Sequence, residues 1–242
     1  MKIVHVGAIS TATVILLGIL MVIPPFIQPS PPLRIALAFS VVDENNALNW
    51  CHDLSRVLEK YDVKATVFVT GRIADLYPNC VRDFSNSVDI GSQTYHYVSL
   101  TTINDYAAQL DEIKRGKEAV DRAGKLSSKV FKAPYEGTNE NIYSFLSRSG
   151  ILADFSYDHQ YNKYYQGQFI KFNLDEYDGN EHNTDFFRSL PVTNPVLITF
   201  DDSTPVEKID DFISNLKSHH IVFVSASELT GIELTVRQGE KN

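Results

Sequence analysis

The sequence predicts an α/β protein, a distorted (β/α) barrel preceded by one transmembrane helix. Two observations lead to this fold class. Beyond residue 33, short apolar runs rich in β-branched residues alternate with amphipathic helical stretches, which is the pattern of repeated β-α units. Ahead of them, an apolar segment without any ionisable side chain is long enough to cross a bilayer.

Residues 1–23 are predicted to form an uncleaved membrane anchor. No ionisable side chain lies between Val6 and Leu33. Lys2 precedes this segment and the next positive charge is Arg34, so the positive-inside tendency places the N-terminus in the cytoplasm. A cleaved signal peptide is the alternative, but large apolar residues stand where a cleavage site needs small ones. We therefore expect a single-pass membrane protein with an extracytoplasmic domain.

Residues 24–32 are rich in proline, which predicts a stiff polyproline II linker between the anchor and a globular domain over residues 33–242. The chain carries a formal net charge of -8 and has no run of lysine and arginine. A protein that neutralises phosphates needs such a basic surface. The charge pattern therefore excludes nucleic acid as a partner, whereas the anchor predicts contact with a membrane.

The predicted strands and helices alternate along the domain. The strands are Ile35–Val42, Ala65–Thr70, Val88–Gln93, Val130–Ala133, Ile151–Phe155, Phe169–Phe172, Val196–Phe200 and Ile221–Val224. The helices are Leu48–Lys60, Ile103–Ala123, Asn139–Ser149 and Val206–Ser218. Parallel strands joined by helices bury both faces of their sheet, and closure into a barrel explains why no strand resembles a charged edge. Functional residues in such folds follow the carboxyl ends of the strands.

Cys51 and Cys80 are the only cysteines of the chain. Outside the cytoplasm two thiols can pair if their Cα atoms come within about 7 Å. The alternative is a pair of buried free thiols. Neither cysteine has the neighbouring histidines or the spacing of a zinc site.

Four segments carry a resemblance to a known family. Residues 58–71 resemble the segment after the first motif of NodB-type polysaccharide deacetylases. Residues 89–97 are similar to the second motif, residues 130–135 to the third, and residues 224–229 to the last strand and turn. This resemblance implies a NodB-type barrel that removes acetyl groups from cell-envelope polysaccharides. It also implies a divalent metal, such as Zn²⁺, Mn²⁺ or Ca²⁺, that polarises the acetyl carbonyl and activates water.

The family's first motif usually reads Thr-Phe-Asp-Asp, a general base followed by a metal ligand. Counting back without gaps from Lys64 assigns these roles to Asp43 and Glu44. Aligning on the preceding strand instead places Ser40 and Val41 there, which removes both carboxylates. We prefer the ungapped register because it keeps two acids at a strand end.

The second motif usually supplies two metal-binding histidines, four residues apart. Gln93 and Tyr97 stand at these positions, and His96 is one residue away from the second. An amide oxygen is a weak ligand, and a tyrosine with its reference pKa of about 10 is protonated at neutral pH. The predicted metal ligands are therefore Glu44, Gln93 and His96, or the domain holds no metal. Tyr97 is assigned to substrate binding.

The third motif retains Pro134 and Tyr135 but has Lys132 where the family has an arginine that orients the catalytic carboxylate. The resemblance assigns Lys132 and Tyr135 to catalysis beside Asp43, and Pro134 and Tyr135 to substrate binding, since the tyrosine backbone helps to stabilise the oxyanion.

The family's late histidine, its proposed general acid, corresponds to Phe200, which cannot donate a proton. Asp201 follows it and is assigned to substrate binding. Together with Asp202, Asp43 and Glu44 it could also form an acidic site for Ca²⁺.

Two hypotheses follow. In the first, the domain binds an envelope glycan or another surface protein without catalysis, because three imidazoles are replaced. In the second, it is a working hydrolase of carbon-nitrogen bonds with a rebuilt metal site. Convergence of Asp43, Glu44, Gln93 and His96 at one end of the barrel would favour the second hypothesis.

Overall fold

The computed structural model describes residues 32–84, 86–156, 161–190, 195–219 and 221–231. The predicted anchor, residues 1–23, and the linker up to residue 31 lie outside the described residues. Within the ranges that are described, no helix is both long and apolar enough to span a bilayer.

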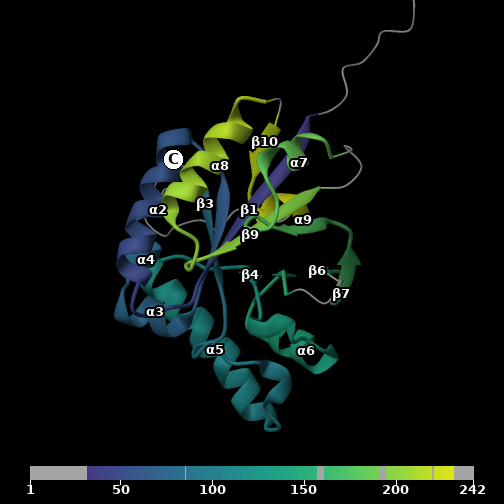
Figure 1. Cartoon of the computed structure of the whole chain (residues 1–242). Helices are drawn as coiled ribbons and strands as arrows, with labels where there is room; N and C mark the ends of the chain where they lie inside the picture. The colour runs from purple at the N-terminus through teal and green to yellow at the C-terminus, as the bar shows by residue number, and fades with distance from the viewer. Residues whose placement is uncertain (1–31, 85, 157–160, 191–194, 220, 232–242) are drawn as a thin grey trace, which may run out of the picture. The chain divides into compact units, whose positions relative to one another are not determined.

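The domain is built on a mostly parallel sheet with helices packed along it (Figure 1). The strand order is β7-β6-β5-β4-β3-β2-β1-β9-β8, and β10 pairs with β1 off this path. The strands are β1 Leu33–Val41, β2 Ala65–Val69, β3 Val88–Ser92, β4 Val130–Phe131, β5 Ala153–Asp154, β6 Tyr161–Tyr165, β7 Gln168–Phe172, β8 Asp175–Asp178, β9 Val196–Asp201 and β10 Ile221–Val224. Only β5-β6 and β6-β7 pair in the antiparallel direction among these strands. The predicted α/β class is confirmed, and the sheet is a half-barrel, because no pairing joins β7 to β8 in the described part.

The helices are α2 Ala47–Tyr61, α3 Gly71–Leu76, α4 Asn79–Arg82, α5 Tyr106–Gly124, α6 Glu140–Arg148, α7 Thr184–Arg188, α8 Val206–Lys217 and α9 Ala226–Thr230, with short 3-10 turns η1 Leu100–Thr102 and η2 Pro134–Glu136. The long helices match the prediction to within a few residues. The strands β6 and β8 and the short helices α3, α4, α7 and α9 were not predicted.

Strand β1 is the centre of the sheet. Its residues 35–40 pair with β9 on one side, and on the other side residues 33–36 pair with β10 and residues 38–41 with β2. Alternate side chains point to opposite faces of a strand. Ile35, Leu37 and Phe39 accordingly join the core beneath α2 and α8, while the small Ala36 and Ala38 belong to the core inside the half-barrel.

The loop after β3 is held by α5. A Cβ atom added to Gly116 of α5 would lie 2.2 Å from the carbonyl oxygen of Gln93, so only glycine allows this approach. The backbone of Tyr95 also donates a hydrogen bond to the Glu112 carbonyl, with 3.0 Å between nitrogen and oxygen. These contacts fix the segment that leads from Gln93 to Tyr97.

Cys51 and Cys80 form a disulfide between α2 and α4, with their Cα atoms 5.1 Å apart. Both cysteines are fully buried. The bond closes a chain segment with a sequence separation of 29 residues. It therefore restricts the unfolded chain more than the folded one.

Strand β5 buries a carboxyl group. Asp154 is fully buried, and its Oδ1 accepts hydrogen bonds from the Ser156 amide at 3.0 Å and the Ser156 hydroxyl at 2.5 Å. Its Oδ2 has no partner within the described residues. Burial raises the pKa of Asp154 to about 7, although hydrogen bonds from Ser156 and Thr138 oppose the shift.

We expect the Cys51→Ala/Cys80→Ala variant to lose about 3.5 kcal/mol of unfolding free energy, because the loop closed by 29 residues is released in the unfolded state. Urea unfolding measures this loss. A reductant should destabilise the wild-type protein by a similar amount and leave the variant unchanged. Identical midpoints for oxidised protein, reduced protein and variant would contradict the prediction.

The carboxyl of Asp154 should make the fold less stable as pH rises. Because its folded pKa of about 7 lies above the ordinary aspartate value of 3.8, the folded state holds a proton that the unfolded state releases between these pH values. The free energy of unfolding should fall by about 2.5 kcal/mol between about pH 5 and about pH 8 through this group.

Asp154→Asn should remove this slope, as measured by urea unfolding across the pH range. The exposed Asp185, whose side chain is 81% accessible, offers the matched Asp185→Asn control, which should keep it. An unchanged slope in Asp154→Asn would show that another group causes the pH dependence.

Candidate functional site

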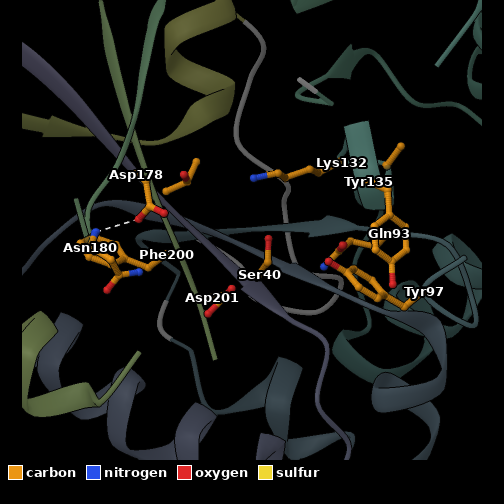
Figure 2. A pocket seen from close by; sticks show the side chains of 11 residues that line it. Ser40, Gln93, Tyr97, Lys132, Tyr135, Asp178, Asn180, Phe200 and Asp201 are labelled. Atoms are coloured by element: carbon orange, nitrogen blue, oxygen red, sulfur yellow. Dashed lines mark hydrogen bonds between the residues drawn. The ribbon is translucent and has the colours of Figure 1, made fainter. Parts of the chain in front are cut away.

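A polar cleft of about 430 Å³ opens at the carboxyl ends of β1, β3, β4, β8 and β9. Eleven residues line it: Ser40, Gln93, Tyr97, Lys132, Ala133, Tyr135, Asp178, Asn180, Thr199, Phe200 and Asp201. In Figure 2, Gln93, Tyr97 and Tyr135 lie on one side, Asp178 and Asn180 lie on the other, and Ser40 and Asp201 lie between them. This is the end of a parallel α/β sheet where functional residues collect.

Strand β1 brings a serine to the cleft. Ser40 is 8% exposed, and its hydroxyl has no hydrogen-bond partner among the described residues. The next residue, Val41, is fully buried in the outer core. This placement corresponds to the alignment on the strand, in which Ser40 and Val41 replace the two carboxylates.

The two acids of the ungapped register, Asp43 and Glu44, are not among the residues of the cleft. The Asp43 carboxylate accepts a hydrogen bond from the Asn45 amide at 3.0 Å, at the start of α2. Glu44 forms an ion pair with Arg72, with 2.5 Å between Oε1 and Nε. The pairing of β1 continues to Val41, so the chain has already left the sheet when it reaches these acids.

Gln93 and His96 of the second motif point in different directions. Gln93 is 1% exposed and its Nε2 donates to the Phe68 carbonyl at 3.0 Å, at the floor of the cleft. His96 is exposed, and its Nδ1 lies 2.7 Å from Glu112 of α5, away from the cleft. The expected joining of His96 and Gln93 in one metal site is therefore not observed.

Tyr97 and Tyr135 form the aromatic side of the cleft, with their ring centroids 5.3 Å apart. Both have left-handed backbones, with φ of 56° and 54°, although neither is a glycine nor a helix cap. Such strain in bulky residues collects at ligand-binding positions. Tyr135 is 68% exposed, whereas its neighbour Pro134 is buried and does not line the cleft.

Lys132 lines the cleft with a side chain that is 19% exposed, and its Nζ lies 3.8 Å from Oε1 of Glu176 in β8. Below Lys132, the Ala133 amide donates to the Ser156 hydroxyl at 2.6 Å. That hydroxyl in turn donates to the buried Asp154. This chain of hydrogen bonds fixes the backbone beneath the lysine.

Strand β9 presents Thr199 and Asp201 to the cleft. Its pairing with β1 places Asp201 directly beside Ser40. Phe200 lies between them in sequence, but its ring packs against Phe39 and Phe212 at centroid distances of 5.7 and 5.3 Å. Phe200, the residue at the position of the late histidine, therefore packs in the outer core and also borders the cleft, beside Thr199.

Two functional candidates, Asp178 and Asn180, were missed by the sequence analysis because β8 was not predicted. The Asn180 amide donates to Oδ1 of Asp178 at 2.7 Å, the contact drawn in Figure 2. The sequence of β9 holds a further signal for this end of the sheet. Residues 199–202 read Thr-Phe-Asp-Asp, the same four residues as the family's first motif.

The cleft has a negative electrostatic character. The pKa of Tyr97 is raised by burial first, and then by Tyr135, Asp201 and Asp202. Burial also raises the pKa of Asp202, while its hydrogen bonds from the Val42 and Asp43 amides, at 2.8 and 2.7 Å, oppose this shift. Asp202 thus joins β9 to the chain leaving β1.

The donor set of the cleft does not fit the family's divalent metal. At the motif positions it offers a hydroxyl, an amide and a phenol, which are weak ligands for a borderline cation when no imidazole accompanies them. In the described part of the chain, no three histidine, cysteine or acidic side chains lie close enough to hold a metal ion. Asp43, Glu44 and His96 consequently form no rebuilt metal site with Gln93, and Asp43, Glu44, Asp201 and Asp202 form no cluster for Ca²⁺.

Known proteins resemble this sequence and this fold. The chain is 23% identical over 210 residues to a peptidoglycan-N-acetylglucosamine deacetylase of Bacillus cereus, covering 83% of this chain and 69% of that protein. A putative polysaccharide deacetylase from Mycobacterium smegmatis superposes with a TM-score of 0.63 at 15% identity, covering 88% of this chain and 99% of the other.

A mutant of a pseudoenzyme of carbohydrate esterase family 4 (CE4) superposes with a TM-score of 0.59 at 17% identity, covering 83% of this chain and 68% of the other. Another mutant of the same pseudoenzyme, with a TM-score of 0.57, is described as having restored enzymatic activity. These structural likenesses establish the fold.

The family model for polysaccharide deacetylase matches residues 30–153, which is more than half of the chain. The match includes β1 with Ser40, the strands β2 to β4, and the loops that carry Gln93, Tyr97 and Lys132. This chain therefore belongs to the polysaccharide deacetylase family.

Proposed function

We propose that the domain binds a cell-envelope glycan in the polar cleft and does not catalyse the metal-dependent deacetylation of its family. The observation that carries this proposal is the set of side chains at the motif positions. The cleft has Ser40 where the family's chemistry needs a carboxylate, and Gln93, Tyr97 and Phe200 where it needs imidazoles. The cleft therefore lacks a firmly bound metal that polarises the acetyl carbonyl and a general acid that protonates the leaving group.

Retention of a ligand site is supported by the shape and polarity of the cleft. It is open, and it combines two tyrosine rings with hydroxyl, amide, carboxylate and ammonium groups. Flat amphipathic rings suit the faces of sugars, and the polar groups suit their hydroxyls. A cleft that had become purely structural would be filled by apolar side chains.

Two further observations support the proposal. One structural relative is itself described as a CE4 pseudoenzyme, so the fold exists without the family's activity. The N-terminal segment from Val6 to Leu33 lacks ionisable side chains, which favours an anchor that would place the domain outside the cytoplasm, beside envelope glycans.

The wild-type chain should bind neither Zn²⁺ nor Mn²⁺ stoichiometrically at micromolar concentration, and it should release no acetate from N-acetylated chitooligosaccharides. Elemental analysis, calorimetry and an acetate assay measure these outcomes. Metal-dependent release of acetate by the wild-type chain would overturn the non-catalytic part of the proposal.

Glycan binding should depend on the cleft tyrosines. We expect Tyr97→Ala to weaken the affinity for oligosaccharides by roughly tenfold, since a stacked aromatic contributes about 1 kcal/mol or more. Tyr106→Ala is the matched control, because Tyr106 is 60% exposed on α5 and does not line the cleft. Equal loss in both variants, or no binding by the wild-type chain to any envelope oligosaccharide, would contradict the glycan-binding role.

A further inference from the structure

We infer that the cleft selects glycans that carry a free amino group, the de-N-acetylated amino sugars, over the same glycans in their N-acetylated form. This inference rests on the proposed glycan-binding function and names the chemical class of its ligand. It follows from the charges, the aromatic faces and the unpaired polar atoms of the cleft.

The charges that face the cleft are unbalanced. Asp178 and Asp201 both line it, and each has only its Oδ1 engaged, by the Asn180 amide and by Ser203 respectively. The second oxygen of each has no partner among the described residues.

The nearby cations do not offset these two carboxylates. Lys132 has its own counterion, because its Nζ lies 3.8 Å from Glu176, a residue outside the lining of the cleft. Lys208 donates to Asn180 at 3.0 Å and is likewise not a lining residue. A cationic ligand would restore the balance.

The aromatic side of the cleft favours the same charge. The ring faces of Tyr97 and Tyr135 carry negative electrostatic potential and attract an ammonium group within about 6 Å. Their left-handed backbones present the pair at the surface, and Tyr135 is 68% exposed. Asp201 lies between the tyrosines and Asp178 (Figure 2), and its charge acts on the Tyr97 hydroxyl, so an ammonium beside Asp201 would lie next to the aromatic side of the cleft.

Two buried groups form the floor of the cleft. Ser40 and Gln93 are 8% and 1% exposed, both line the cleft, and in the described part of the chain neither the Ser40 hydroxyl nor Oε1 of Gln93 has a partner. The Gln93 amide nitrogen is used by Phe68, which leaves the oxygen to accept.

Apart from the ion-paired Lys132 and the hydroxyls of Ser40, Tyr97 and Tyr135, which can donate or accept, the unengaged polar atoms of the cleft are the acceptor oxygens of Asp178, Asp201 and Gln93. An ammonium supplies three donors, whereas an acetamide brings one donor, a carbonyl acceptor and a methyl group. Acceptors left facing a carbonyl oxygen are unpaired, and unpaired polar groups are the strongest source of discrimination between similar ligands. The class of reaction that would supply this ligand is the hydrolysis of an acetamide on a glycan.

The test is calorimetric titration of the full chain with the tetramer of glucosamine and with its fully N-acetylated form, at low salt and mildly acidic pH, where the amine is protonated. We expect the free amine to bind at least about tenfold more tightly, and the preference to shrink as salt screens the charges. Asp178→Asn and Asp201→Asn should each reduce binding of the amine by roughly threefold to fivefold and leave the acetylated tetramer unaffected.

Asp185→Asn is the charge-matched control on the exposed surface of α7, and it should keep the full preference. Asp201 accepts from Ser203, so circular dichroism must confirm that its variant is folded. Asp178→Asn tests the inference independently.

Equal or tighter binding of the acetylated tetramer would overturn this inference and leave the glycan-binding proposal standing. Binding of neither tetramer would overturn the inference and count against the proposed function itself. Equally tight binding of tetralysine would show that the cleft recognises charge without a sugar, which would also overturn the inference.

Discussion

The site depends on the pairing of β1 with three strands. Residues 33–41 are held by β10, β2 and β9, and their alternation leaves no freedom in which side chain reaches the cleft. Ser40 must point inward because Phe39 and Val41 are buried in the outer core. A carboxylate placed three or four residues later cannot replace it, because the chain has by then left the sheet.

The same pairing gives the neighbouring strand its role. Asp201 lies beside Ser40 in the register of β1 and β9, so an acid remains at this end of the sheet although β1 supplies none. Asp202, one residue later, faces the opposite way and accepts from the Val42 and Asp43 amides. Asp202 therefore stabilises the loop that follows β1, while Asp201 is available to a ligand.

Much of the fold could be predicted from the sequence because its central strands are apolar on both faces. The strands β1, β2, β9 and β10 are recognised as short apolar runs, and the long helices by their amphipathic periodicity. Strand β8 reads Asp-Glu-Tyr-Asp and resembles a solvated loop, yet it is held by pairing with β9. Such tertiary pairing overrides local propensity and cannot be read from a single segment.

The sequence predicted only part of the site, because most of the assigned residues lie in loops beyond strand ends, where the sequence alone does not fix the direction of a side chain. Gln93, Lys132, Tyr135, Tyr97 and Asp201 were assigned to the site and line the cleft. Asp43, Glu44 and His96 were also assigned, but they lie beyond strand ends, where loop contacts such as the Arg72 ion pair decide direction. The choice between the two alignments of the first motif depended on which residue ends β1.

The cleft carries energetic costs that its own protein contacts do not offset. Two tyrosines have left-handed backbones, each of which costs on the order of 1 kcal/mol or more. At the floor of the cleft, the Ser40 hydroxyl and Oε1 of Gln93 have no partner among the described residues and are available to a ligand. A ligand that donates hydrogen bonds to the floor and packs on the tyrosines would offset these costs, which is the physical reason to regard the cleft as a binding site rather than the remains of an active site.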